Sequence, residues 1–141
     1  MRDSFGGAFM LNMALVFIVV YIAFLAVAIN YAKAFRVKNN VINILEQYQY
    51  SGGSNEIAIR KVEDYLPEVA YNMAGNNKVE QHCYDQASNP VFIENGVCII
   101  NESGNSDPKY FRVITYISID FPFFNIHLTV PVSGETKSIY N

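Results

Sequence analysis

The chain opens with an uncharged, largely apolar run that extends from Phe5 to Ala32. A helix of about 20 apolar residues crosses a hydrocarbon core of roughly 30 Å, so a run of nearly thirty residues can span a membrane with turns to spare. Secretory signal sequences have a basic leader and an apolar core of about 7–15 residues, whereas the leader here carries one basic side chain, Arg2. We therefore predict a retained membrane anchor and not a cleaved signal sequence.

Beyond this run, apolar residues recur every three or four positions as far as Tyr48, which is the spacing of one helical face. The run and the stripe together predict one continuous helix from about Ser4 to Tyr50, roughly 70 Å long. Two helices with a bend near Asn30 or Asn39 are the alternative, although neither Pro nor Gly enforces a bend there.

Three basic residues, Lys33, Arg36 and Lys38, follow the uncharged run directly. At the end of a transmembrane segment, long basic side chains keep their stems in lipid and their charges among the headgroups. We predict that all three anchor the segment at the membrane interface, with membrane lipid as the partner of the run.

The rest of the chain is acidic. Four of the ten Lys and Arg residues lie before residue 40, but only one of the thirteen Asp and Glu residues does. Because nucleic-acid binding needs a basic face that displaces counterions, nucleic acid is not an expected partner.

The residues after the first helix predict a small α+β head. Helical spacing continues after Ser54, with a kink or break expected at Pro67 and a C-terminal cap at Gly75. From Lys78 the pattern changes to β, where Asn-Gly at 95–96 predicts a type I′ hairpin, residues 111–121 a long strand and residues 124–130 its partner. The predicted fold is a long N-terminal helix, a second helix and a small antiparallel sheet laid over the outer half of the first helix.

The only two cysteines, Cys83 and Cys98, are spaced to close a loop of about 15 residues. A disulfide there would contribute about 3 kcal/mol and would persist only outside the cytosol. Two reduced thiols remain an alternative, as does a zinc site in which His82 and His127 complete a Cys2His2 set. We favour the disulfide. It places the head outside the cytoplasm and the N-terminus inside, although the count of basic residues flanking the run slightly favours the opposite orientation.

Catalytic motifs are not found. The sequence contains no Gly-x-Ser-x-Gly, no phosphate-binding loop and no His-Glu-x-x-His. The two histidines and the scattered acidic residues have no spacing typical of a metal or catalytic site, so we expect neither an enzyme nor a cofactor.

The start of the uncharged run resembles the type IV pilin superfamily and its TadE-like (Tad-type) minor members. In that family a glycine precedes an apolar helix whose fifth residue is acidic, and Gly7, Ala8 and Asn12 have this geometry. The resemblance implies a leader of residues 1–7 cleaved between Gly7 and Ala8, a spine helix of residues 8–50 and an extracytoplasmic head of residues 51–141. It also implies that Asn12 contacts a neighbouring subunit. Where the family usually has Glu, the Asn12 amide can hydrogen-bond a neighbour's amino terminus but cannot form an ion pair.

The resemblance implies a structural function, as a pilin-like subunit of an envelope-spanning filament or of a secretion or pilus apparatus. Its partners would be identical copies or other pilin-like subunits. The alternative is a permanently anchored, single-pass binding module of a surface or conjugation complex. That alternative depends on the acidic head and its tyrosines, a residue type enriched at interfaces and also common in half-buried strands. The tyrosines are Tyr48, Tyr50, Tyr65, Tyr71, Tyr84, Tyr110, Tyr116 and Tyr140.

Overall fold

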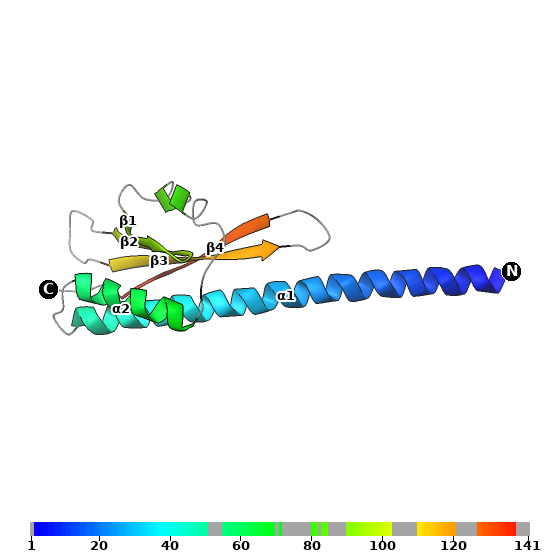
Figure 1. The fold of residues 1–141 in the computed structure, drawn as a ribbon, viewed down its shortest axis with the longest axis horizontal. Helices are drawn as coiled ribbons and strands as arrows, with labels where there is room; N and C mark the ends of the chain where they lie inside the picture. Colours follow the sequence, from blue (N-terminus) through cyan, green and yellow to red (C-terminus); the bar gives the residue numbers. More distant parts are fainter. Residues whose placement is uncertain are drawn as a thin grey trace.

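The computed structural model describes residues 2–50, 55–69, 71, 80–81, 83–84, 90–102, 110–120 and 127–137. In this part of the chain, two helices precede four strands: α1 (Arg2–Tyr50), α2 (Asn55–Glu68), β1 (Pro90–Glu94), β2 (Val97–Glu102), β3 (Tyr110–Asp120) and β4 (His127–Glu135). The second half of α1, α2 and the sheet form a head, and the first half of α1 projects from it as a stalk (Figure 1). The predicted α+β class is confirmed.

α1 is one uninterrupted helix of 49 residues, about 70 Å long at 1.5 Å per residue. The alternative of two helices that meet near Asn30 or Asn39 is not found, because residues 2–50 form one helix. The apolar stripe of its second half forms the buried face, which includes Ala34, Val37, Val41 and Leu45. The continuous helix predicted from the spacing is therefore confirmed.

α2 ends at Glu68, immediately after Pro67. Proline has no backbone N–H and its ring crowds the preceding turn, so the helix stops where the sequence predicted a kink or break. The chain turns back at once, as the Tyr71 N–H donates to the carbonyl oxygen of Leu66 at 3.2 Å. The predicted cap at Gly75 lies outside the described residues.

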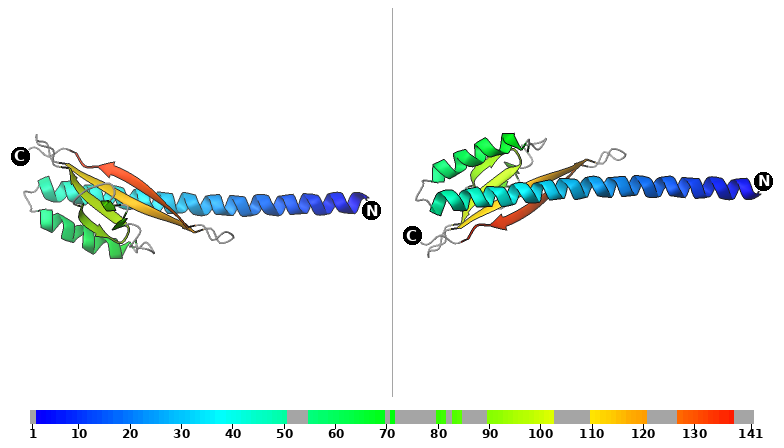
Figure 2. Two further views of the ribbon diagram at one scale, coloured as in Figure 1. Left: turned by 90° about the horizontal axis from the view of Figure 1, so that it is seen from above. Right: turned by 90° about the horizontal axis from the view of Figure 1, so that it is seen from below.

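The strands form an antiparallel meander in the order β1-β2-β3-β4. Asn95 and Gly96 both have positive φ, at 54° and 81°, as the predicted type I′ hairpin requires. One face of the sheet packs on α1 and α2, and the strands cross α1 obliquely (Figure 2). Val62 and Leu66 of α2 and Val113 of β3 belong to this main core.

The opposite face of the sheet carries a second, smaller core. Cys83 packs there on Ile100 of β2 and on Ile114 and Tyr116 of β3. Residues 80–81 and 83–84 are helical, so the prediction of β structure from Lys78 onward is wrong for these four. Of these four residues, only Cys83 is buried against the sheet.

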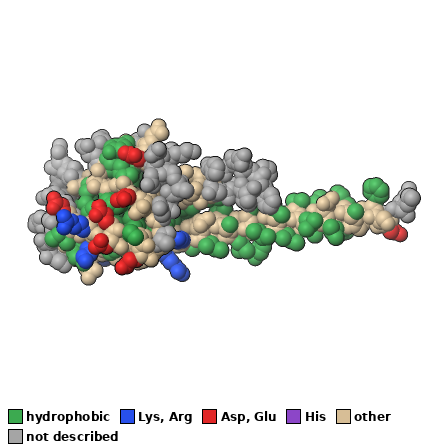
Figure 3. Space-filling model, viewed as in Figure 1, with side chains coloured by type: hydrophobic (Ala, Val, Ile, Leu, Met, Phe, Trp, Pro, Cys, Tyr) green, Lys and Arg blue, Asp and Glu red, His purple; other side chains and the backbone are tan. Residues whose placement is uncertain are grey.

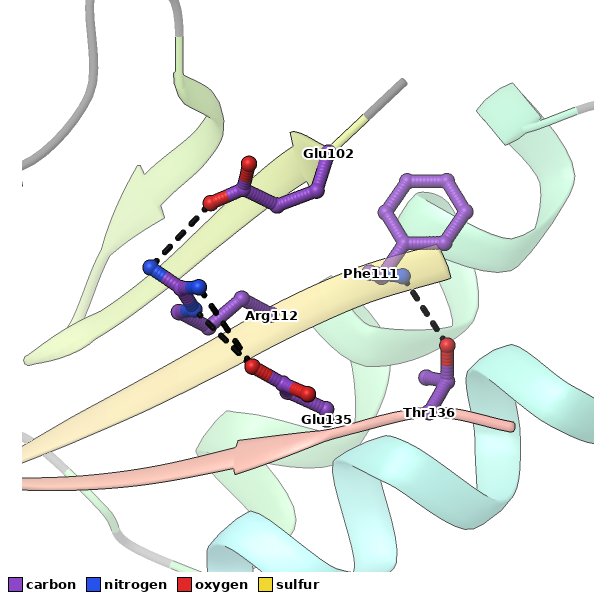
Figure 4. Close-up of polar contacts among 5 residues, drawn as sticks. All are labelled: Glu102, Phe111, Arg112, Glu135 and Thr136. Carbon is purple, nitrogen blue, oxygen red and sulfur yellow. Dashed lines mark hydrogen bonds and ion pairs between the residues drawn. The ribbon is translucent and has the colours of Figure 1, made fainter. Parts of the chain in front are cut away.

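β4 is an edge strand and extends to Glu135, beyond the predicted end at residue 130. Its far end is joined to β3 by the Phe111 N–H, which donates to Thr136 Oγ1 at 2.9 Å (Figure 4). Beside it, Arg112 pairs with Glu102 of β2 at 3.1 Å and with Glu135 at 3.4 Å. The buried Phe111–Thr136 bond and the more exposed pairs of Arg112 together connect β2, β3 and β4.

Candidate functional site: the exposed half of the first helix

The first half of α1 is surrounded by no other part of the described structure. Its apolar side chains are exposed on every side of the helix, as is clear for Phe5, Phe9, Met10, Leu11, Phe17 and Phe24. In Figure 3 hydrophobic side chains cover the stalk, whereas charged side chains gather over the head. By length and composition α1 can cross a membrane, and none of its most apolar window is buried within the protein.

Gly7, Ala8 and Asn12 lie in the first turns of α1 and are all exposed. A Cβ atom added at Gly6 or Gly7 would meet nothing within 4 Å. Glycine inside a helix is less stable than alanine by roughly 0.5–1 kcal/mol, so these two glycines weaken the helix without serving any contact in the described fold. Cleavage after Gly7 and a subunit contact at Asn12 stay predictions.

The three basic residues after the run differ in their surroundings. Lys33 and Arg36 are exposed, whereas Lys38 is only 8% exposed. The Lys38 Nζ atom lies 4.2 Å from the centroid of the Phe35 ring, and its side-chain carbons pass beneath Gly134 of β4. Lys38 therefore packs between α1 and the sheet. Interface anchoring by Lys33, Arg36 and Lys38 stays a prediction.

Burial of α1 becomes complete just after the uncharged run ends. Ala23 and Val27 are half-buried, and Ala34 is the first described residue of α1 to be completely buried. The Thr115 hydroxyl, at the middle of β3, lies 3.3 Å from the Ala34 carbonyl oxygen. From there β3 runs along α1 toward the stalk (Figure 1). The second half of β3 therefore lies on the stalk side of Ala34, a relationship that no local sequence signal could predict.

Cys83 and Cys98 are joined in a disulfide, with Cα atoms 6.2 Å apart. Both residues are completely buried, and the bond attaches the helical segment at residues 83–84 to β2. Among the described residues, no group of three or more His, Cys, Asp and Glu side chains could hold a metal ion. The side chains of His82 and His127, which the zinc alternative requires, lie outside the described ones.

Among the described residues of the head, two tyrosines have clearly shifted pKa values. The Tyr71 hydroxyl donates to the Tyr116 carbonyl oxygen at 2.6 Å, and burial raises the pKa of Tyr71 to about 12. Burial also raises the pKa of Tyr116. The bond from the Tyr71 phenol to the Tyr116 backbone connects the segment after α2 to the sheet, which is a structural role.

Comparison with family models, with curated proteins and with solved structures finds no match to this chain.

Proposed function

We propose that the chain is a structural, pilin-like subunit of an envelope-spanning filament or secretion apparatus, held in the membrane by the first half of α1. The observation that carries the proposal is the division of one rigid helix into two parts. One part is apolar and exposed all round, and the other is the buried spine of a compact head. A helix of this kind serves equally as an anchor in lipid and as an assembly element among similar helices.

Assembly would exchange lipid contacts for helix–helix contacts. Close approach of helices in an apolar medium is favoured by small side chains, and the stalk has exposed small residues at Gly6, Gly7, Ala8, Ala14 and Ala26. The exposed glycine pair, which the described fold does not require, supports a role that involves another molecule. Identical copies or other pilin-like subunits are the proposed partners.

The disulfide supports an orientation with the head outside the cytoplasm, because such bonds persist in oxidising compartments. The N-terminus would then be cytoplasmic, where a leader peptidase acts on residues 1–7. In this orientation the head would lie at the outer membrane surface or on the surface of a filament.

Leader cleavage tests the proposal most directly. We expect the full chain, coexpressed with a prepilin peptidase, to lose residues 1–7 as measured by intact mass. Gly7→Leu should abolish this loss, because the family has glycine at the residue before the cut. Gly6→Leu, which adds the same bulk one residue earlier, is the matched control and should still be cleaved. Retention of residues 1–7 in the wild type, or their loss from Gly7→Leu, would contradict cleavage at this site.

Asn12 provides a second test, on assembly. We expect Asn12→Glu to increase filament yield after cleavage, because a carboxylate can form an ion pair with a neighbour's new amino terminus. Asn12→Leu should reduce the yield, because it removes the hydrogen-bonding group while remaining compatible with lipid. Filament yield that is unchanged in both variants would contradict a subunit contact at Asn12.

The alternative, a permanently anchored binding module, receives less support from the head. Of the tyrosines whose side chains the structure describes there, Tyr71 and Tyr116 are buried and Tyr84 is exposed, while Tyr48, Tyr65 and Tyr110 are half-buried. Most therefore contribute to packing within the head. Retention of residues 1–7 in the mature protein, without filaments, would favour this alternative.

A further inference from the structure

The β4 strand carries an apolar face that becomes progressively exposed toward the stalk. Residues on alternate positions of a strand share a face, and Val132, Val130 and Leu128 share the face that packs toward α1. Val132 is buried with the main core at 8% exposure, whereas Val130 is 38% and Leu128 47% exposed. Leu128 and Val130 are called the stalk-side patch below.

The β3 partners of these residues belong to the same layer. Ile117 pairs with Val130 and Ile119 pairs with Leu128, and both isoleucines pack against the main core. Leu128 and Val130 therefore form the exposed edge of the main core and are not isolated surface side chains. It lies at the end of the hairpin closest to the stalk (Figures 1 and 2).

The length of the uncharged run places this hairpin end at the depth of a bilayer surface. Residues 5–32 span about 42 Å of helix at 1.5 Å per residue, which equals the roughly 40–45 Å of a bilayer with its headgroup regions. A hydrocarbon core of about 30 Å centred in this run would end near residue 28. The Thr115 contact with Ala34 lies about six residues beyond this level, and β3 runs from that contact toward the stalk.

We infer that the stalk-side patch lies in the headgroup and outer acyl region of the membrane, so that the head contacts the bilayer through Leu128 and Val130. This inference rests on the membrane anchoring in the proposed function, and lipid is the molecule that covers the patch. The six residues between β3 and β4 are uncharged in sequence, FPFFNI. Lys33 and Arg36 then lie at or above the outer edge of the headgroups, beside the head.

Single tryptophans test this contact, since the chain contains no native tryptophan. The full chain is reconstituted in phosphatidylcholine vesicles that contain lipids brominated either near the headgroup or near the bilayer centre. We expect Leu128→Trp to emit at short wavelength and to lose most of its fluorescence to the shallow bromines. Ser133→Trp, exposed further along the same strand, is the matched control and should be quenched by aqueous iodide instead.

Phe17→Trp, in the exposed stalk, separates this inference from the membrane anchor itself. Strong quenching of Phe17→Trp by deep bromines, with Leu128→Trp quenched only by iodide, would overturn the patch and leave the anchor intact. Absence of lipid quenching at Phe17→Trp would overturn the anchor and the patch with it. Val130→Trp provides a second probe if Leu128→Trp fails to form the head. A short-wavelength emission quenched by neither agent would mean that protein covers the patch, which also overturns the inference.

Discussion

The hydroxyl of Thr115 in β3 lies 3.3 Å from the carbonyl oxygen of Ala34 in α1, and both residues are completely buried. The same hydroxyl is also 3.3 Å from the Val132 carbonyl oxygen in β4. A hydroxyl has one proton, so it donates to one of these two carbonyls at a time. Thr115 thus positions the sheet on α1 at the point where full burial of the helix begins.

Thr115→Val should lower the free energy of unfolding of the head by about 1 kcal/mol, because it removes a buried hydrogen bond while almost preserving shape. Thr129 in β4 is only half-buried, so Thr129→Val should change the free energy of unfolding by less. Chemical denaturation of the full chain in detergent micelles, followed by near-ultraviolet circular dichroism of its tyrosines, measures both. Equal effects for the two variants would contradict a special role for Thr115.

Stability should fall at high pH because of Tyr71. Its pKa is raised to about 12 in the folded state, whereas an unfolded tyrosine has a pKa near 10. The folded protein therefore holds the phenol proton more tightly. This contribution is fully present below pH 10 and is lost as pH rises through about 12, at up to about 1.4 kcal/mol per pH unit.

Tyr71→Phe should make the decline in stability between pH 10 and pH 12 shallower, and it should cost about 1 kcal/mol at neutral pH through loss of the bond to Tyr116. Tyr84→Phe, at an exposed tyrosine, is the control for general effects of phenol removal. Denaturation series at pH 7 and above pH 10 measure the free energy of unfolding of wild type and of both variants. A Tyr71→Phe protein with the wild-type pH profile would show that another group causes the decline.

Gly134 should tolerate alanine but not a large side chain. A Cβ atom there would lie 2.9 Å from Ile42 Cδ1 and 3.1 Å from the Lys38 Cδ and Cε atoms. These are outer atoms of flexible side chains, which can move slightly, so we expect Gly134→Ala to cost less than about 1 kcal/mol. Gly134→Leu should separate β4 from α1 and cost about 1–3 kcal/mol. Denaturation midpoints that are equal for the two variants would contradict the close approach.

The ion pairs of Arg112 should contribute little despite their prominence in Figure 4. The side chains of Arg112, Glu102 and Glu135 are 33%, 34% and 54% exposed, and exposed pairs contribute about 0–1 kcal/mol. Arg112→Gln should therefore lower stability by less than about 1 kcal/mol, and high salt should reduce the difference. Denaturation at low and high ionic strength checks this. A loss of several kcal/mol that salt does not change would contradict it.

Reduction of the Cys83–Cys98 bond should lower stability by about 3 kcal/mol, the chain-entropy value for a loop of this length. Cys83→Ala with Cys98→Ala should behave like the reduced wild type, although loss of two buried sulfur atoms adds to its cost. The measurement is denaturation with and without a reductant. Suppose that the reductant leaves the unfolding midpoint of wild type unchanged, while the midpoint of the double variant is lower. The loss of stability in the double variant would then come from lost packing of the sulfur atoms and not from loss of the covalent bond.

The sequence by itself determined the elements whose signals are local. The uncharged run and the stripe through Tyr48 predicted one helix, and Pro67 predicted the end of α2 because it lacks a backbone donor. The Asn95-Gly96 pair predicted a turn with two positive φ angles. Each of these depends on the chemistry of neighbouring residues, so spacing alone was sufficient.

Only the tertiary structure decided what depends on residues far apart in the chain. Lys38 has the composition of an interface anchor, but β4 folds over it. The second core and the bond to Cys98 hold Cys83 against the sheet. The position of β3 and β4 along α1 depends on where Thr115 meets Ala34. Contacts between residues far apart in the chain arise from packing between elements. The periodicity of residues within one element does not predict them.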